Sequence, residues 1–298
     1  MKQYASPSKK QQEKADLTFL ILTFNEEVNL PYLLDNICDL GAEIFILDSY
    51  STDRTVEIAS SFGAKIFYRK FDNFSNQRNF ALEQLPITTP WVFFIDADEL
   101  LSSELKIEIL KELRGSTVDA YYINRRFYWK DKWIKRGYYP ISLLRIGRLG
   151  KIQCDDSPVN EHLICTSGKV KSLRNDFMDY NRKDLNAWIS KHNEYSNEEA
   201  KRLFTDRKLK GANVFGNQYQ RKRWIRRTIW TRLPPLIRPV FYFLYRYVVR
   251  GGFLDGKEAF MYHFLHAFIY RMLIDFKYLE LKWNRNQLKI KTLDQDKK

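Results

Sequence analysis

The sequence predicts an α/β fold in which a mostly parallel sheet carries helices on both faces. Leu17–Thr23 and residues 91–95 are continuous apolar runs, as expected for strands that are buried on both sides. Two shorter strands are expected between them, at residues 44–47 and 64–68. Because strands and helical segments alternate along this part of the chain, we expect crossover connections and a parallel sheet.

The expected helices are recognised by their cap and stop residues. Asn25, followed by Glu26 and Glu27, indicates a cap and an acidic first turn, and Gly41 ends that helix near residue 40. Serines open three more helices, at about residues 51–62, 75–85 and 102–114. Farther along, the pattern predicts strands at residues 119–128 and 142–146 and helices at residues 184–204 and 258–281.

The charge of the chain is unevenly distributed. Its 298 residues include 50 Lys and Arg against 36 Asp and Glu, a net charge of +14, which favours anionic partners. Residues 221–250 contain nine Lys or Arg residues and no acid, interleaved with aromatic side chains. This pattern predicts contact with an anionic membrane surface. It leaves open an oligomer interface through which protomers would pair. We expect no nucleic-acid partner, since the chain shows no RNA-binding module.

The cysteines and the hydropathy indicate the compartment. Cys38, Cys154 and Cys165 have no CxxC spacing, and the N-terminus lacks a signal-peptide pattern, which together predict a reducing cytoplasm. No segment has about 18 uncharged apolar residues, so no ordinary transmembrane helix is expected. With the basic, aromatic tail, this predicts a cytoplasmic protein held peripherally on the inner face of the membrane.

Polar residues cluster where the predicted strands end. Ligands of parallel α/β sheets bind beyond the carboxyl ends of the strands, so these residues are candidates for nucleotide binding, with helix capping as the alternative for Asn25 and Asp53. They are Thr23, Asn25 and Glu26 after the first strand, Asp48, Ser49 and Asp53 after the second, and Asp96 and Asp98 after the fourth.

Asp96 and Asp98 carry the strongest chemical signal. Two carboxylates one residue apart at the end of a buried strand are costly to desolvate without a cation. A divalent metal, Mg²⁺ or Mn²⁺, that bridges them to a diphosphate is the natural partner; a solvated turn is the alternative. Arg78, in the first turns of its helix, could donate a charge-assisted hydrogen bond to the same diphosphate, or it could be a surface arginine.

Four segments in order, LTFLILTFNEE, FILDSYSTDRT, NFSNQRNFAL and WVFFIDADE, resemble the nucleotide-binding half of family 2 glycosyltransferases. The resemblance implies the GT-A fold, a Rossmann-like sheet, here followed by a helical, amphipathic C-terminal extension. It also implies that Asp48 reads the nucleotide base, that Asp96 contacts the ribose or metal, and that Asp98 is the metal ligand on the donor diphosphate.

The segment Val159-Asn160-Glu161-His162 is similar to a Val-His-Glu element of bacterial lipopolysaccharide-core glucosyltransferases of this family. The glutamate matches, whereas the histidine follows it instead of preceding it. The resemblance implies that Glu161 is the general base that deprotonates the acceptor hydroxyl. Asp155 and Asp156 are the rival bases.

These features predict three regions and one reaction. The regions are an arm at 1–15, a catalytic domain at 16–215, with a donor half (16–115) and an acceptor half (116–215), and a basic-aromatic helical region at 216–298. The reaction is inverting transfer of a sugar from a nucleoside-diphosphate sugar, UDP-linked, to a membrane-linked saccharide such as lipopolysaccharide core. The alternatives are a nucleotidyltransferase, which would need a Gly-rich loop after the first strand, and a non-catalytic membrane or nucleic-acid binding module.

Overall fold

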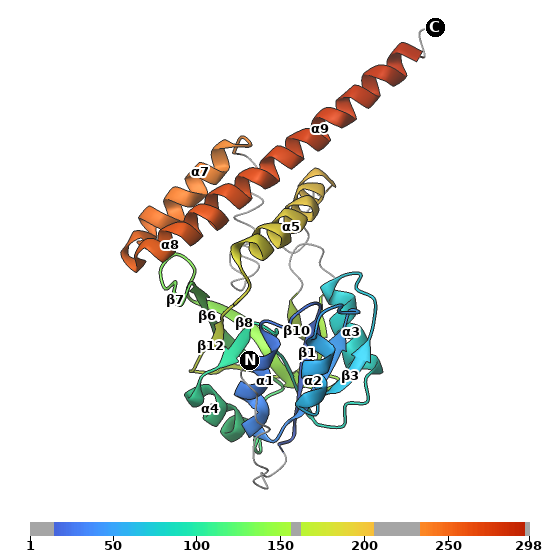
Figure 1. Cartoon of the computed structure of the whole chain (residues 1–298), viewed down its shortest axis with the longest axis vertical. Coiled ribbons are helices and arrows are strands. Elements are labelled where there is room, and N and C mark those ends of the chain that lie inside the picture. Colours follow the sequence, from blue (N-terminus) through green and yellow to red (C-terminus); the bar gives the residue numbers. More distant parts are fainter. Residues whose placement is uncertain (1–14, 156–161, 206–232, 296–298) are drawn as a thin grey trace. The chain divides into compact units, whose positions relative to one another are not determined.

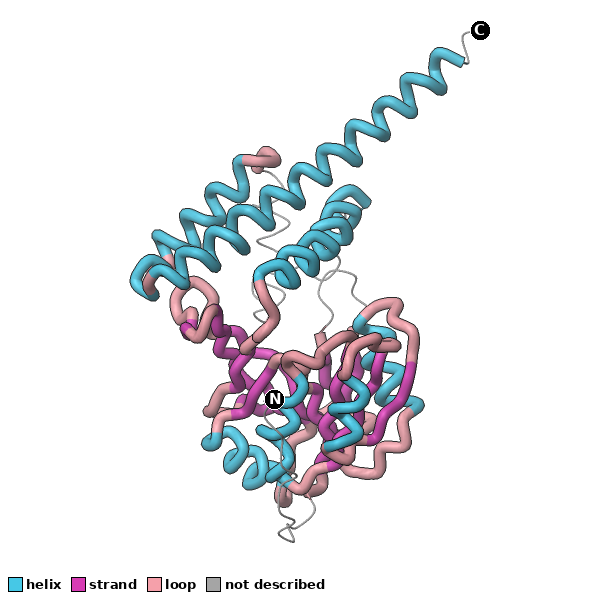
Figure 2. Tube along the Cα trace, viewed as in Figure 1, coloured by secondary structure: helices cyan, strands magenta, loops and turns pink. Residues whose placement is uncertain are grey.

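The protein divides into two compact units, one up to Lys183 and one from Asp184 onward. The computed structural model describes residues 15–155, 162–205 and 233–295. The first unit is an α/β sheet structure and the second is helical (Figures 1 and 2). The predicted arm, and the predicted domain boundary near residue 215, lie outside the described residues.

The first unit is built on a ten-stranded sheet, in which eight strands follow the order β3-β2-β1-β4-β8-β6-β12-β5 and the other two, β7 and β11, pair with β6. Strands β1 to β4 pair in parallel, which confirms the predicted strand and helix alternation. The register aligns Thr23 of β1 with Asp48 of β2, and Asp48 with Tyr68 of β3, so the ends of these strands form one edge. The parallel strands are β1 (Leu17–Thr23), β2 (Glu43–Asp48), β3 (Lys65–Tyr68) and β4 (Trp91–Phe94).

The other strands extend this sheet beyond β4. Strand β8 pairs antiparallel with both β4 and β6, whereas β11 and β12 run parallel to β6. Strand β5 pairs antiparallel with β12, and β9 and β10 form a separate two-stranded sheet. The bounds are β5 (Glu99–Leu101), β6 (Ala120–Trp129), β7 (Lys132–Trp133), β8 (Ile141–Arg148), β9 (Ile152–Cys154), β10 (Leu163–Cys165), β11 (Val170–Ser172) and β12 (Phe177–Asp179).

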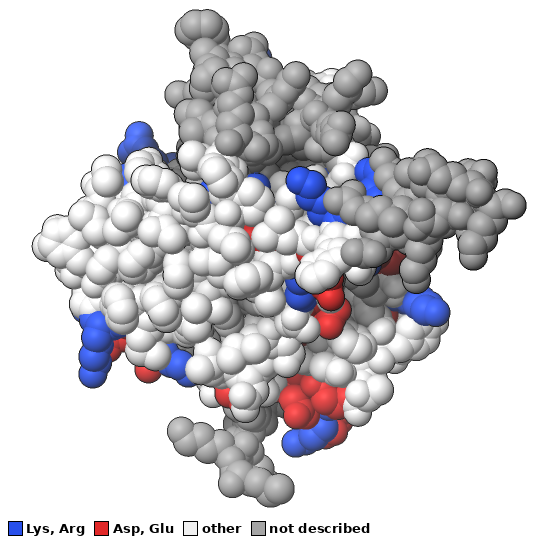
Figure 3. Space-filling model, turned by 90° about the horizontal axis from the view of Figure 1, so that it is seen from above, with Lys and Arg blue, Asp and Glu red and all other residues white. Residues whose placement is uncertain are grey.

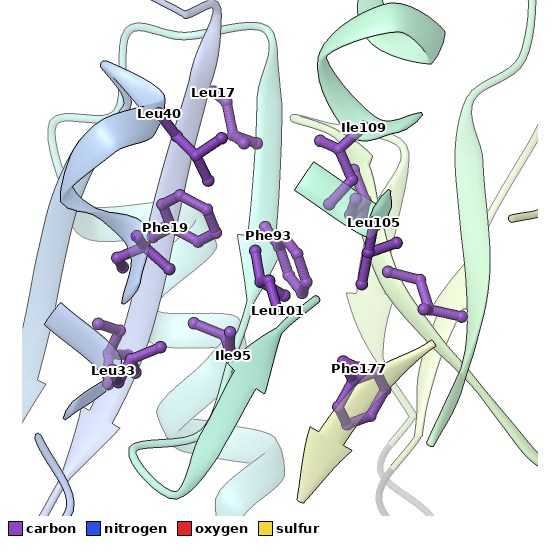
Figure 4. Close-up of a cluster of buried hydrophobic side chains, with 14 of the residues drawn as sticks. Leu17, Phe19, Leu33, Leu40, Phe93, Ile95, Leu101, Leu105, Ile109 and Phe177 are labelled. Atoms are coloured by element: carbon purple, nitrogen blue, oxygen red, sulfur yellow. The ribbon is translucent and has the colours of Figure 1, made fainter. Parts of the chain in front are cut away.

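Helices cover both faces of the sheet because alternate residues of each strand point to opposite sides. On one face, Phe19 and Phe93 have ring centroids 5.3 Å apart and pack with Leu33 of α1 and Leu105 of α4 (Figure 4). On the other face, Leu20 and its neighbours pack with α3 and the β9–β10 pair. The helices are α1 (Leu30–Ile37), the 3₁₀ turn η1 (Cys38–Leu40), α2 (Thr55–Ser61), α3 (Phe74–Gln84) and α4 (Ser103–Leu113).

The second unit consists of helices that pack on each other. Helix α5 (Leu185–Thr205) packs against α9 (Tyr270–Gln295), where Lys277 donates to both Asn193 and Asn197. Helix α5 thus belongs to the second compact unit, and the predicted extent of the catalytic domain, to residue 215, stays a prediction. The remaining elements are α7 (Ile237–Leu244), the π-helical η3 (Tyr245–Val249), the 3₁₀ turn η4 (Gly252–Asp255), α8 (Lys257–Tyr262) and the π-helical η5 (His263–Ile269).

The predicted fold class is therefore confirmed: a mostly parallel, GT-A-like sheet with flanking helices, followed by a helical C-terminal region. The predicted helix at 258–281 is present as α8, η5 and α9 in succession, with a π-helical stretch in its middle. In the part of the chain that the structure describes, no helix combines the length and apolarity needed to cross a membrane.

Candidate donor-binding site

The loops after β1 and β2 are joined to each other by hydrogen bonds. The Asn25 amide donates to Ser51 Oγ at 2.9 Å, and Asn25 Oδ1 accepts from the Thr52 amide at 2.8 Å. The expected cap at Asn25 is wrong, because α1 begins at Leu30 and Asn25 has a left-handed φ of 54°. Asn25 instead binds the neighbouring loop. Its left-handed backbone conformation is one that asparagine tolerates better than most residues.

Asp48 lies at the centre of this junction. Its carboxylate is fully buried and accepts from the Thr23 hydroxyl at 2.7 Å, from the Ser51 hydroxyl at 2.6 Å and from the Ser51 amide at 2.7 Å. Ser49, the next residue, accepts from the amide group of Gln77 on α3 at 3.0 Å. Asp48 Oδ1 accepts one of these bonds and could accept a second from a nucleotide base, provided that the base reaches this buried carboxylate.

Glu26 and Asp53 fix the outer part of the same loops. Glu26 Oε1 lies 2.7 Å from the Lys183 ammonium, and the Glu26 amide donates to Thr55 at 2.7 Å. Asp53 caps its own turn by accepting from the Thr55 amide, and it also accepts from the Glu27 amide. Burial alone would raise the pKa of Asp53, but the bonds from Thr55 and Glu27 and the charge of Lys183 lower it. Both acids thus hold the loops together while remaining near the sheet edge.

Asp96 is clamped between two arginines at the end of β4. Arg145 Nη2 lies 3.1 Å from Asp96 Oδ2, and Arg78 Nη2 lies 3.6 Å from Asp96 Oδ1. Arg145 also pairs with the buried Glu99, whose Oε2 accepts from the Asp96 amide at 2.9 Å. Burial would lower the pKa of Arg145, but the facing carboxylates of Glu99 and Asp96 raise it, so Arg145 stays charged. Arg78 therefore lies beside Asp96, and its bond to a donor diphosphate stays a prediction.

The carboxylate of Asp98 differs from that of Asp96. The residue is half-buried, and its backbone carbonyl accepts from the Tyr180 amide at 2.7 Å, which fixes the turn. Within the described ranges, no hydrogen bond or ion pair occupies the Asp98 carboxylate. No cluster of three His, Cys, Asp or Glu side chains converges on a metal position among the described residues. A site with only the Asp98 carboxylate, and Asp96 beside it, fits Mg²⁺, because Mg²⁺ takes one or two carboxylates together with phosphate oxygens and water.

Glu161 and Asp156, two of the three candidate bases, lie outside the described residues. The residues on either side of that gap are placed: the Asp155 amide donates to the His162 carbonyl at 2.9 Å. Helix α3 holds this point, because Ser75 donates to the Asp155 carbonyl, and the Asn79 side chain bonds both the amide and the carbonyl of Cys154. Arg78 stands on the same helix between Ser75 and Asn79, so α3 links both ends of the gap to Asp96.

Comparison with known proteins decides the family. The family model described as "Glycosyl transferase family 2" matches residues 18–175, which is more than half of the chain. The match includes the loops after β1 and β2, Arg78, Asp96 and Asp98. The chain belongs to glycosyl transferase family 2.

Several relatives and solved structures are similar to this family 2 glycosyltransferase. An uncharacterized glycosyltransferase of Rickettsia typhi, RT0209, is 26% identical over 264 residues, covering 85% of this chain and 83% of the relative. Glycosyltransferase SunS of Bacillus subtilis is 41% identical over 108 residues, 34% of this chain and 25% of SunS. The structure of S. aureus TarS 1–349 in complex with UDP-GlcNAc is 12% identical, with 92% of each chain covered and a TM-score of 0.44. Glucosyl-3-phosphoglycerate synthase from Mycobacterium tuberculosis, in complex with Mn²⁺, UDP and phosphoglyceric acid, is 19% identical, covering 37% of this chain and 43% of that one, with a TM-score of 0.32.

Some residues of the site were not found from the sequence. Arg145 stands between the apolar residues Leu144 and Ile146 of β8, and a charge at that position was the available signal. Three exposed aromatic side chains, Phe24, Tyr50 and Tyr68, lie at the ends of β1, β2 and β3. The rings of Tyr50 and Tyr68 stack with centroids 5.8 Å apart. Large aromatic residues in loops just after strands would have indicated them.

Proposed function

We propose that this protein catalyses inverting transfer of a hexosyl group from a UDP-sugar to a hydroxyl of a membrane-linked saccharide. The observation that supports it best is the pair Asp96 and Asp98, of which the first is held by two arginines and the second is left with its carboxylate unoccupied by described residues. This arrangement at the carboxyl end of a parallel strand suits a metal-bound diphosphate.

The donor would be held by its charges and by its base. Asp98, with Asp96 beside it, would hold Mg²⁺ or Mn²⁺ against the two phosphates. When bound, the metal would supply Lewis-acid stabilisation of the leaving diphosphate. Arg78 would donate to a phosphate oxygen, since its guanidinium lies 3.6 Å from Asp96 Oδ1.

The base and ribose of the donor would contact the loops after β1 and β2. Thr23, Asn25, Glu26, Ser49 and Asp53 all belong to, or contact, the two loops that Asp48 joins. Asp48 would act on the base either directly or through Ser51, whose amide and hydroxyl it fixes. The exposed aromatic faces of Phe24, Tyr50 and Tyr68 would add stacking, which contributes roughly 1–3 kcal/mol per base.

Glu161 would remove the proton of the attacking hydroxyl. It precedes His162, which α3 and Asp155 hold in place next to the donor side of the site. Asp155 and Asp156 remain the alternatives, and a base must lie within hydrogen-bond reach of the proton it removes. With the base and the leaving diphosphate on opposite sides of the anomeric carbon, one displacement inverts the configuration.

We place the acceptor in lipopolysaccharide core or another cell-surface glycan, and the protein at the inner face of the cytoplasmic membrane. The exposed apolar side chains of α7 and η3 and the basic sequence before them support this location. A polar acceptor hydroxyl carried by a lipid stays at that surface, so an enzyme held there meets it more often. Pairing of protomers through this region is the alternative role for the same part of the chain.

The proposal is tested by thermal shift with a panel of sugar nucleotides, with and without Mn²⁺. One UDP-sugar should raise the melting temperature only when metal is present. Asp98→Ala should lose this stabilisation and sugar transfer while melting like the parent protein without ligand. Glu83→Ala, an exposed acid on α3, is the matched control and should keep both. Full activity of Asp98→Ala, or of the parent protein with its metal chelated, would overturn the mechanism.

A further inference from the structure

The outer face of α7 and η3 is a continuous apolar stripe. Side chains exposed by 40% or more recur at the three- and four-residue spacing of one helical face. They are Ile237, Val240, Phe241, Leu244, Tyr245 and Val248. Water-facing helices of a monomeric protein normally carry polar residues on this face, so a stripe of this length indicates a binding surface.

The opposite face of the same helix is anchored, so the stripe has a fixed orientation within the second unit. Arg238 is buried and pairs with the buried Asp275 of α9, whose carboxylate also accepts from the Leu236 amide at 2.8 Å. Phe243 packs against Phe264, with ring centroids 6.1 Å apart. Rotating the helix to hide the stripe would expose this ion pair and these rings.

The stripe continues into the turn that follows it. Phe253 and Leu254, at η4, are 50% and 59% exposed, and Met261 of α8 is 43% exposed. Gly252 allows this tight turn, because a Cβ there would stand 2.6 Å from His263 Nε2 and 3.0 Å from the Arg246 carbonyl. The turn therefore presents two large apolar side chains next to the helical stripe.

The charges around this face are mostly positive. From residue 236 to residue 254 the sequence contains no Asp or Glu, and Asp255 is buried. Arg250 and Lys257 are exposed at the edge of the stripe, where Lys257 lies 4.0 Å from Glu258 Oε1. Figure 3 shows a broad area without charged side chains on one side of the molecule, with side chains of both signs at its lower margin. Two copies joined through this face would bring like charges together, whereas anionic lipid headgroups would neutralise them.

We propose that the exposed apolar face of α7, η3 and the η4 turn is a membrane-binding surface that inserts into the headgroup region of an anionic bilayer. This inference adds to the proposed function the surface that would hold the enzyme near its acceptor. Only the link to the acceptor rests on the proposed function. The sequence predicts membrane contact over residues 221–250, of which residues 221–232 lie outside the described residues. The inserted side chains proposed here are Phe241, Leu244, Val248, Phe253 and Leu254.

The test is vesicle flotation of the full chain with phosphatidylglycerol-containing vesicles and with pure phosphatidylcholine vesicles. The parent protein should float with the anionic vesicles and much less with the neutral ones. Phe241→Ser combined with Val248→Ser should lower the partition coefficient at least about tenfold, since burying either side chain contributes roughly 1.5–3 kcal/mol. Ile107→Ser, an apolar residue 69% exposed on α4, is the control and should float like the parent.

Two further measurements separate this proposal from the others. The double variant should keep the metal-dependent thermal shift with the sugar nucleotide, so a failure of donor binding and a failure of membrane binding are distinguishable. Light scattering after size exclusion should give the same mass for parent and variant. Equal flotation of parent and variant, absence of flotation of the parent, or a dimer that the double substitution dissociates would each overturn the proposal.

Discussion

Arg145 Nη2 lies 3.1 Å from Asp96 Oδ2, and Arg145 stands between the apolar residues Leu144 and Ile146 of β8. The same guanidinium group pairs with Glu99, three residues after Asp96, so one buried cation fixes both ends of the turn that carries Asp98. The orientation of Asp96 is thus set by the protein before any ligand binds. Asp98 is then the carboxylate of the pair that a metal can recruit without breaking an ion pair in the described structure.

Replacing Arg145 by Met should destabilise the protein strongly. The change leaves the buried Glu99 without its counter-charge, and breaking a buried pair from one side costs about 3–5 kcal/mol. Urea denaturation at neutral pH measures the loss. Arg145→Met combined with Glu99→Leu should recover most of it, because both charges are then absent. A single variant as stable as the parent would show that the pair contributes nothing.

Replacing Asn79 by Ala should impair transfer more than donor binding. Asn79 bonds both the amide and the carbonyl of Cys154, and losing the two bonds should cost roughly 1–3 kcal/mol. The segment that contains Glu161 begins just after this point, so its placement should suffer while the Asp98 turn is unchanged. Steady-state kinetics should show a lower kcat with a donor KM close to that of the parent. Gln84→Ala, on the exposed end of α3, serves as control, and a purely raised donor KM would contradict the prediction.

Replacing Asp48 by Asn should loosen the two donor loops. The amide cannot accept all three bonds that the buried carboxylate now receives from Thr23 and Ser51. We expect a loss of roughly 1–3 kcal/mol in stability, together with weaker binding of the sugar nucleotide. Differential scanning calorimetry and titration calorimetry measure the two effects. A variant that keeps its stability but loses only donor affinity would instead indicate direct contact of Asp48 with the base.

The second unit should become less stable in mild acid because of His192. Burial, with the nearby charges of Lys191 and Arg271, lowers the pKa of His192 to about 4, although its bond to the Trp188 carbonyl opposes this. A histidine in the unfolded chain titrates near about 6.5, so between these values the unfolded chain binds the extra proton. Stability is therefore complete above about pH 6.5 and falls as the pH falls toward 4. His192→Gln should flatten this part of the urea-midpoint profile; an unchanged profile would refute the assignment.

The sequence predicts the sheet well and the loops poorly. The apolar runs at 17–23 and 91–95 predict buried strands whatever the order of the strands in the sheet, so β1 and β4 were predicted nearly to the residue. The prediction for Asn25 was wrong because an asparagine that caps a helix and an asparagine that bonds a distant loop look the same in the sequence. Arg145 was missed because its partners, Asp96 and Glu99, are more than 45 residues away in the chain. Contacts of that range depend on strand order, which local patterns do not contain.

The hydrogen bonds between the loops after β1 and β2 constrain how this protein can be redesigned. Asn25 bonds Ser51 and Thr52, Glu26 bonds Thr55, and every bond joins residues 26 to 29 positions apart in the chain. Lengthening one loop by a single residue would shift all its donors out of register with the other loop. Changing the sugar-nucleotide preference by exchanging loops between relatives would therefore require that both loops be replaced together.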